Sequence, residues 1–239
     1  MNDFEFTIII PVYNEADNLE RVKTELLRFV DVALKKSKVL FINDGSVDGS
    51  FEKIKEICNT SPEIFSYCSF DRNYGLSAAI KAGFDYSNTS LTGYIDADLQ
   101  TSPMEFNKLL EHADEYEMVT GVRTNRKDSF VKNISSLIAN AIRRAFTHDG
   151  MEDTGCPLKI IHTDVAKRIP MFKGLHRFLP AMVMLQNGKV LQIPVQHFQR
   201  IAGKSKYNLW NRLFGPLMDC FAYLWMKKKY INYTVTDHA

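Results

Sequence analysis

The sequence lacks the residue patterns of several common protein classes. Glycine and proline together supply only 20 of its 239 residues, too few for a collagen-like or low-complexity chain. Its four cysteines lie far apart and show none of the paired spacings that zinc or redox sites use. They are Cys58, Cys68, Cys156 and Cys220. We therefore expect buried, reduced thiols, which are typical of a cytosolic compartment.

Two kinds of hydrophobic segment are also missing. The first five residues, 1–5, carry acidic side chains where a signal peptide needs basic ones, so a cleaved leader is not expected. The most apolar stretch, 213–226, has only 14 residues, contains Asp219 and is interrupted by Gly215-Pro216. A bilayer-spanning helix needs about 20 apolar residues. The sequence therefore predicts no transmembrane helix.

The glycine-rich loops that bind phosphates in many α/β proteins are absent as well. No two glycines are separated by a single residue, which excludes the Gly-x-Gly-x-x-Gly motif of dinucleotide-binding proteins. Gly203-Lys204-Ser205 resembles the end of a P-loop, but Phe198 occupies the position of its first glycine. These mismatches argue against a nicotinamide dehydrogenase and against a P-loop kinase or GTPase.

The charge of the chain is small in total and unevenly distributed. A hydrophobic content of 45% and a charged content of 24% indicate a globular chain with one well-filled core. The net charge is +2, but residues 123–146 and 196–239 each carry +5, which leaves −8 for the remainder. Two basic regions favour an anionic partner, with nucleic acid, phosphorylated lipid and nucleotide as candidates, although a solvated charged surface is the plain alternative.

Apolar runs and helical periodicity alternate through the first half of the chain. Strands are expected at 6–11, 39–42, 64–70, 91–95 and 118–122, and helices at 18–34, 51–57, 76–84 and from 102 onward. The second half predicts a helix at 130–146, strands near 157–161 and 190–195, and a long apolar segment at 209–229. This alternation predicts an α/β fold with a single, mostly parallel sheet and helices on both faces.

Three polar loops follow the predicted strands. They are Tyr13-Asn14-Glu15, Asp44-Gly45-Ser46 and the segment 96–100. Ligands of parallel sheets bind at the carboxyl ends of the strands, so we place the active site there. Asp96 and Asp98, with Gln100 two residues further, supply oxygen ligands at alternate positions, which suit Mg²⁺ or Mn²⁺, and we expect Asp44 to add a third carboxylate to this acidic cluster. For the aspartates alone, a loop-capping role is the alternative.

Four motifs in order resemble those of a known enzyme family. They are Ile10-Pro11-Val12-Tyr13-Asn14-Glu15, the segment 43–50, the segment 73–79 and Asp96-Ala97-Asp98-Leu99-Gln100. This set resembles the inverting nucleotide-sugar glycosyltransferases of family 2, which have the GT-A fold. Residues 153–156 and 200–207 are similar to the branch that transfers sugars to polyprenyl phosphates, the dolichyl- and undecaprenyl-phosphate transferases.

The resemblance implies roles for individual residues on the donor side. Nucleotide-sugar binding would fall to Pro11, Tyr13, Glu15, Asp44, Asp71, Lys81 and Asp96. The metal ligands would be Asp98 and Gln100, holding Mg²⁺ or Mn²⁺ against the donor diphosphate. A cation there neutralises charge on the departing nucleoside diphosphate.

The resemblance also implies phosphate contacts on the acceptor side. The catalytic set would be Asp98, Arg123, Arg200 and Lys206, and acceptor or phosphate binding would involve Arg126, Asp153 and Ser205. Arginine suits this role because its guanidinium matches phosphate oxygens in a fork.

The leading hypothesis is inverting transfer of a sugar from a UDP- or GDP-sugar to a polyprenyl phosphate. A phosphate acceptor is already an anion and needs positioning more than proton removal. Transfer to a saccharide hydroxyl in cell-surface polysaccharide synthesis stays open, because Glu152-Asp153 lies where hydroxyl-accepting relatives carry a base. A non-catalytic membrane-surface module is a third hypothesis. Nucleic acid is not expected as a partner, because acidic loops flank the basic regions.

We divide the chain into a glycosyltransferase domain, 1–207, and a C-terminal amphipathic helical extension, 208–239. The aromatic side chains of 210–225 and the lysines of 227–229 have the composition of a helix that lies on a membrane surface, although packing on the domain is the alternative. We therefore expect a cytoplasmic protein that is peripheral to the cytoplasmic face of the membrane. The sequence leaves its oligomeric state open, including a homo-oligomer.

Overall fold

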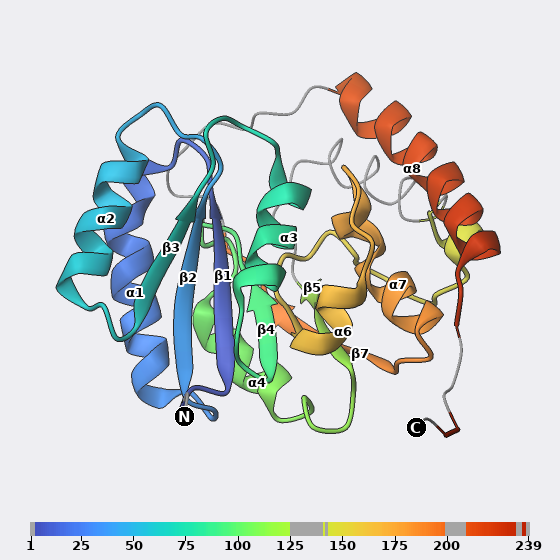
Figure 1. Ribbon diagram of the computed structural model, residues 1–239, viewed down its shortest axis with the longest axis horizontal. Helices are drawn as coiled ribbons and strands as arrows, with labels where there is room; N and C mark the ends of the chain where they lie inside the picture. The colour runs from blue at the N-terminus through green and yellow to red at the C-terminus, as the bar shows by residue number, and fades with distance from the viewer. Residues whose placement is uncertain (1–2, 125–140, 142, 199–208, 233–235, 238–239) are drawn as a thin grey trace.

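The computed structural model describes residues 3–124, 141, 143–198, 209–232 and 236–237, with the backbone alone for 209–216. In this part of the chain, seven strands form one sheet with the order β3-β2-β1-β4-β6-β5-β7 (Figure 1). The strands are β1 (Phe6–Val12), β2 (Ser37–Asn43), β3 (Phe65–Ser69), β4 (Leu91–Tyr94), β5 (Met118–Thr124), β6 (Lys159–His162) and β7 (Val190–Gln196). Only β6 runs antiparallel to its neighbours β4 and β5. The predicted mostly parallel sheet is confirmed.

Helices cover both faces of the sheet (Figure 1). One face carries α1 (Leu19–Val32), α2 (Ser50–Thr60) and α4 (Phe106–Leu110), and the other carries α3 (Leu76–Tyr86), α6 (Thr163–Arg168), α7 (Leu179–Leu185) and α8 (Leu209–Lys229). Short 3-10 turns lie at Ala16–Asn18, Pro103–Glu105 and Leu175–Phe178. The arrangement has three layers, as the alternation of strands and helices predicts.

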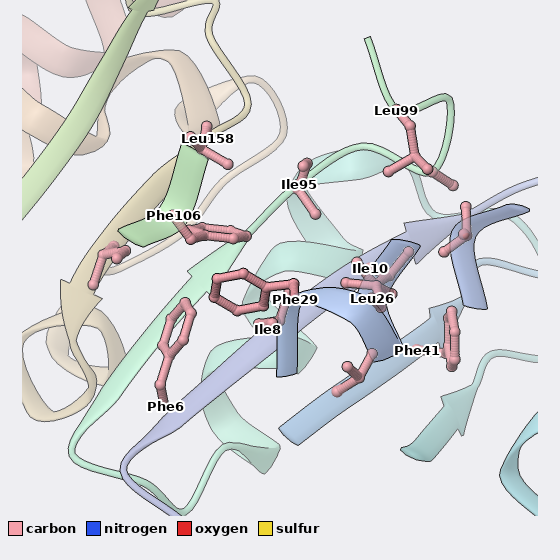
Figure 2. Packing of buried hydrophobic residues seen from close by; sticks show 14 of the residues in the cluster. Phe6, Ile8, Ile10, Leu26, Phe29, Phe41, Ile95, Leu99, Phe106 and Leu158 are labelled. Carbon is pink, nitrogen blue, oxygen red and sulfur yellow. The ribbon is translucent and has the colours of Figure 1, made fainter. Parts of the chain in front are cut away.

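The core follows from the period of each element. Alternate residues of β1 face opposite layers: Ile8 and Ile10 pack toward α1, whereas Ile9 packs toward α3. Figure 2 shows the first layer, where the rings of Phe6, Phe29 and Phe106 lie together; the centroids of Phe6 and Phe106 are 5.2 Å apart. Because β1 is buried on both faces, its run of consecutive apolar residues is the expected pattern for a central parallel strand.

The predicted elements of the first half are present with ends shifted by a few residues. The second half is less accurately predicted: α6, the 3-10 turn at Leu175–Phe178 and α7 were not expected. Most of the helix predicted at 130–146 lies outside the described residues. At its C-terminal end, the described residues 143–147 are helical. Within the described residues, no helix combines the length and the apolar content needed to cross a membrane.

Candidate functional site

The carboxyl ends of several strands meet at one edge of the sheet. β1 is parallel to β2 and to β4, so the segments that follow Val12, Asn43 and Tyr94 lie at the same edge. β6 is antiparallel to both β4 and β5, which makes these two strands parallel to each other and brings Arg123 to this edge too. The segment before Lys159, which contains Asp153, reaches the edge from the opposite direction. The structure therefore gathers the polar loops that the sequence analysis singled out.

The loop after β1 is hydrogen-bonded to the loop after β2. The backbone N–H of Asn14 donates to Ser46 Oγ at 3.1 Å, and the Asn14 Oδ1 accepts from Val47 N at 2.8 Å. Asn14 has a φ of 53°, a left-handed conformation that asparagine tolerates better than most residues. The backbone N–H of Glu15 donates to Ser50 Oγ at 2.9 Å. These bonds hold the two loops as one unit.

The predicted nucleoside-binding residues of the first loop lie in this unit. Pro11 is in β1 and is partly exposed, as are Tyr13 and Glu15. The carboxylate of Glu15 accepts a hydrogen bond from Asn18 Nδ2 at 2.7 Å, which orients it at the start of the first helix. Their positions at the edge agree with the predicted role, and nucleotide contact by each of them stays a prediction.

Asp44 binds the segment that precedes α3. Its Oδ1 accepts from Tyr74 N at 2.7 Å, and its Oδ2 accepts from Gly75 N and from Asn73 Nδ2, both at 2.9 Å. Only 3% of Asp44 is exposed, and this burial raises the pKa of its carboxyl, while the two backbone hydrogen bonds oppose the rise. Asp44 therefore fixes the segment 73–75, here called the donor-side segment because the resemblance implies that Asp44 binds the nucleotide-sugar donor.

The loop after β2 also approaches the backbone around Arg72, and this close approach depends on Gly45. It has a φ of 66°, and a Cβ built on it would lie 2.2 Å from the backbone carbon of Arg72. The neighbouring Asp71 is exposed at the same edge. Lys81 lies further along α3 and forms an ion pair with Asp85 on the same helix. The predicted contacts of Asp71 and Lys81 with a nucleotide stay predictions.

A tight turn follows β4. Leu99 has a φ of 49°, and its N–H donates to Asp96 O at 3.2 Å, while Gln100 N donates to Asp98 Oδ1 at 3.1 Å. The side chain of Leu99 is only 2% exposed and belongs to the same buried hydrophobic cluster as Ile95 (Figure 2). An apolar anchor thus holds a strained turn between Asp98 and Gln100. Phe198 N donates to Gln100 O at 2.7 Å, which brings the end of the segment 190–198 to this turn.

Asp98 and Gln100 are suitable ligands for a hard divalent cation. Mg²⁺ and Mn²⁺ prefer oxygen ligands, and Mg²⁺ is usually held by one or two carboxylates together with substrate phosphates. The expected acidic cluster, however, is wrong in one respect. No group of three His, Cys, Asp or Glu side chains in the described ranges could hold a metal, and the oxygens of Asp44 bind the donor-side segment. Within the described residues, the candidate ligands for a cation at this edge are therefore Asp98 and Gln100 rather than a cluster of three carboxylates.

Arg123, near the end of β5, and Asp153 form a bidentate ion pair. Arg123 Nε donates to Asp153 Oδ2 at 2.7 Å, and Arg123 Nη2 donates to Asp153 Oδ1 at 2.9 Å. The backbone N–H of Arg123 adds a third bond to Oδ2 at 3.2 Å. The side chain of Asp153 is thus used to orient Arg123. Four further predicted site residues, Arg126, Arg200, Ser205 and Lys206, lie outside the described residues.

Sequence reasoning missed a buried cation behind this edge. Lys159 is completely buried, and its ammonium donates to Thr154 O at 3.2 Å and to Cys156 O. It also lies 5.2 Å from the centroid of the Tyr94 ring. Burial lowers the pKa of Lys159 to about 8. The sequence feature that could have indicated it is a single lysine within the apolar run 156–161, because a buried ammonium needs hydrogen-bond acceptors inside the fold.

Comparison with known proteins gives consistent matches. Residues 7–169 match the model of a family described as "Glycosyl transferase family 2". The chain is 32% identical over 227 residues to undecaprenyl-phosphate 4-deoxy-4-formamido-L-arabinose transferase from Edwardsiella ictaluri, covering 92% of this chain and 70% of that protein. It is 34% identical over 218 residues to the protein of the same name from Klebsiella pneumoniae, covering 89% and 65%. The chain thus spans about two thirds of the length of these relatives.

Two solved structures resemble the fold. One is the mannosyltransferase PcManGT from Pyrobaculum calidifontis in complex with GDP-Man and Mn²⁺, with a TM-score of 0.66, 18% identity and coverage of 92% of this chain and 64% of that one. The other is glucosyl-3-phosphoglycerate synthase from Mycobacterium tuberculosis in complex with Mn²⁺, UDP and glucosyl-3-phosphoglycerate, with a TM-score of 0.72, 12% identity and coverage of 94% and 80%. At these identities the likeness concerns the fold.

Proposed function

The chain belongs to glycosyl transferase family 2 and has the GT-A fold, and on this premise we propose that it transfers a sugar from a nucleotide-sugar donor to a polyprenyl phosphate with inversion at the anomeric carbon. The observation that carries the proposal is the edge of the sheet at which the donor-side segment, the Asp98–Gln100 turn and the Arg123–Asp153 pair meet. The names of the relatives, which are undecaprenyl-phosphate sugar transferases, support the acceptor.

The proposed reaction is a single displacement. A phosphate oxygen of the acceptor forms a bond to the anomeric carbon while the bond from that carbon to the nucleoside diphosphate breaks. The acceptor is an anion at neutral pH, so the protein must position it and offset its charge rather than remove a proton. Arg123, oriented by Asp153, offers its guanidinium for this purpose.

A divalent cation is part of the proposal, as Mg²⁺ or Mn²⁺ at Asp98 and Gln100. Both similar structures contain Mn²⁺ together with a nucleotide or nucleotide sugar. When bound, such an ion would offset the negative charge that develops on the leaving diphosphate. The chain's own contribution is the turn itself, in which the buried Leu99 keeps Asp98 and Gln100 close together.

Transfer to a saccharide hydroxyl is less well supported. That reaction needs a general base, and the sequence candidates were Glu152 and Asp153. The carboxylate of Asp153 already accepts three hydrogen bonds from Arg123, which leaves it poorly placed to take a proton. Glu152 is exposed, and its backbone N–H donates to Gln192 Oε1 at 2.8 Å.

The proposal includes peripheral binding to a membrane surface, because a polyprenyl phosphate is held in a membrane. The described part of α8 has two faces: Cys220 and Tyr223 are 2% exposed and pack on the domain, whereas Met218, Phe221 and Trp225 are 65%, 53% and 68% exposed. An apolar stripe that ends in three lysines, 227–229, suits an interface with anionic lipid. We propose that the extension 208–239 lies on the cytoplasmic face.

The test is a transfer assay with radiolabelled UDP- and GDP-sugars in the presence of Mn²⁺ or Mg²⁺. Undecaprenyl phosphate is one acceptor, and an oligosaccharide mixture is the other. We expect label in the organic phase with the lipid acceptor. Label that enters only the aqueous oligosaccharides would contradict the proposed acceptor and favour the hydroxyl reaction.

A further inference from the structure

Ser77 joins the donor-side segment to a distant part of the chain. It lies in the first turn of α3, two residues after Gly75, and is 6% exposed. The carbonyl of Gly75 accepts from Ala78 N at 2.9 Å, so the segment that Asp44 holds is continuous with the first turn of the helix. A displacement of Ser77 would therefore displace the donor-side segment as well.

The hydroxyl of Ser77 makes two contacts with the turn that contains Gly174 and His176. Gly174 N donates to Ser77 Oγ at 2.9 Å, and His176 Nδ1 lies 2.8 Å from the same oxygen. Burial, and then the positive charges of Arg177 and Lys159, lower the pKa of His176 well below its usual value. A neutral imidazole can accept through Nδ1, so the hydroxyl can accept from Gly174 and donate to His176 at the same time.

Helix α8 packs on the same turn. Gly174 has a φ of 97°, and a Cβ built on it would lie 2.2 Å from Asp219 Oδ2, so the Asp219 carboxylate covers this glycine closely. Arg177 Nη1 lies 3.9 Å from the same oxygen. The ring of Tyr223 stacks on Phe178 with the centroids 5.6 Å apart. The turn is thus held from one side by α8 and from the other by Ser77.

We propose that Ser77 is a positioning residue through which the packing of α8 sets the donor-side segment. The inference rests on the proposed function, which places the nucleotide-sugar donor at the edge of the sheet where this segment lies. The link consists of consecutive contacts: Asp219 covers Gly174, Gly174 donates to Ser77, and Ser77 lies in the first turn of α3, whose preceding segment binds Asp44. Binding of α8 to a lipid surface would then reach the donor side without any contact between the lipid and the nucleotide.

The test measures the Kd of UDP and of GDP, each with Mn²⁺, by calorimetry on the full chain. Ser77→Ala is expected to raise the Kd about fivefold, the equivalent of one neutral hydrogen bond. Ser87→Ala is the matched control. It removes another buried hydroxyl from the end of the same helix, where Ser87 bonds to Gly83 O at 2.6 Å and to Thr92 Oγ1 at 3.1 Å. The control should lower the Tm and leave the Kd unchanged.

A second pair of variants avoids dependence on one substitution. His176→Leu removes the partner of Ser77 and should raise the Kd, whereas His176→Asn keeps a polar atom near Nδ1 and should restore it. In addition, Asp219→Ala and Ser77→Ala should act non-additively on the Kd, because both disturb the same turn.

The outcomes separate the inference from the function. Equal Kd values for the parent and Ser77→Ala, or equal effects of Ser77→Ala and Ser87→Ala, overturn the inference alone. Additive effects of Ser77→Ala and Asp219→Ala overturn the role of α8. Binding of neither nucleotide by the folded parent contradicts the proposed function and removes the basis of the inference with it.

Discussion

Arg123 and Asp153 are joined by two side-chain hydrogen bonds of 2.7 and 2.9 Å, although 30 residues separate them in the sequence. The pair lies where β5 ends and where the chain returns toward β6, so it ties two sides of the candidate site together. Most of the Arg123 side chain is buried, with 14% exposed, and its guanidinium plane is fixed by the carboxylate. An arginine held in this way is ready to meet a phosphate without first losing much side-chain freedom.

This geometry predicts that Asp153→Asn impairs transfer even though Arg123 is retained. The guanidinium would lose its bidentate partner, and we expect the rate of transfer to undecaprenyl phosphate to fall about 100-fold, as for the loss of one preorganised donor in a site. Initial rates at saturating donor measure the effect. Asp164→Asn is the matched control, since it breaks the exposed pair between Asp164 and Arg168 and should change the rate less than about twofold. Equal losses in the two variants would refute the positioning of Arg123.

The Asp98–Gln100 turn predicts a metal-dependent stabilisation. In the parent, UDP or GDP should raise the Tm more with Mn²⁺ than without it, and EDTA should abolish the difference. Asp98→Asn should lose the Mn²⁺-dependent part, because the amide offers a weaker ligand than the carboxylate. Asp114→Asn, at an exposed residue paired with Lys35, should keep it. A full Mn²⁺ response in Asp98→Asn would place the metal elsewhere.

The sequence predicted the elements of the first half and the edge at which the loops meet, because parallel strands joined by helices bring all their carboxyl ends to one side. It did not predict the contacts of Asp44. Its carboxylate binds Tyr74 and Gly75, about 30 residues away, and such an approach of two loops leaves no periodic pattern in the sequence. The predicted clustering of Asp44 with Asp96 and Asp98 therefore overlooked these backbone partners.

The strand near 157–161 was predicted, but its antiparallel direction and the burial of Lys159 were not. Lys159 within a short apolar run suggests an exposed strand position, whereas the structure places this lysine at the centre of the sheet between β4 and β5. The buried ammonium is stabilised by the carbonyls of Thr154 and Cys156 and by the ring of Tyr94. These groups come from two separate parts of the chain, so the local sequence does not reveal them.

Burial of Lys159 predicts a pH-dependent stability. Its pKa falls from 10.5 to about 8 on folding, so between these values the unfolded chain holds a proton that the folded chain has released. The contribution of Lys159 to the free energy of unfolding therefore rises with pH in this window and is least favourable below about pH 8. Lys159→Met removes this dependence, so the stability of the parent relative to the variant should increase as the pH is raised through the window.

Urea unfolding of both proteins at several pH values measures this difference. The comparison with the variant is needed because the raised pKa values of buried groups such as Cys58 act in the opposite direction in both proteins. Lys189→Met, at an exposed lysine, is the control for loss of the charge. A parent-to-variant difference that does not change with pH would show that Lys159 keeps its ordinary titration.

The outer stripe of α8 predicts binding to vesicles that contain anionic lipid. Replacing Met218 and Trp225 by serine should weaken co-sedimentation with phosphatidylglycerol vesicles, because both side chains are mostly exposed apolar groups. The matched control replaces Val32 and Leu34, which are 56% and 59% exposed and lie at and just beyond the end of α1. Raised salt should weaken binding through the lysines at 227–229. Equal sedimentation of both double variants would contradict a role for α8. If the α8 double variant instead has a smaller molecular mass in solution than the parent, the stripe is a contact between two copies of the chain.

Two glycines of one loop allow the effect of backbone strain on stability to be distinguished from the effect of close packing. Gly45 and Gly49 both have positive φ values, 66° and 84°, so alanine is strained at either position. A Cβ at Gly49 meets nothing within 4 Å, whereas a Cβ at Gly45 would lie 2.2 Å from the backbone of Arg72. We expect Gly49→Ala to cost about 1 kcal/mol and Gly45→Ala at least about 2 kcal/mol more, because a backbone cannot move aside as a flexible side chain can.

Urea unfolding of the two variants measures the costs, and nucleotide binding measures their consequence. The Arg72 backbone leads directly into the donor-side segment, so Gly45→Ala should also weaken UDP or GDP binding under conditions in which it is still folded. Gly49→Ala should bind like the parent, since its strain lies outside the contact between the two loops. An equal loss of unfolding free energy in the two variants would mean that the loop at 71–75 moves easily to make room. The donor side would then take its shape when the nucleotide binds rather than being preformed.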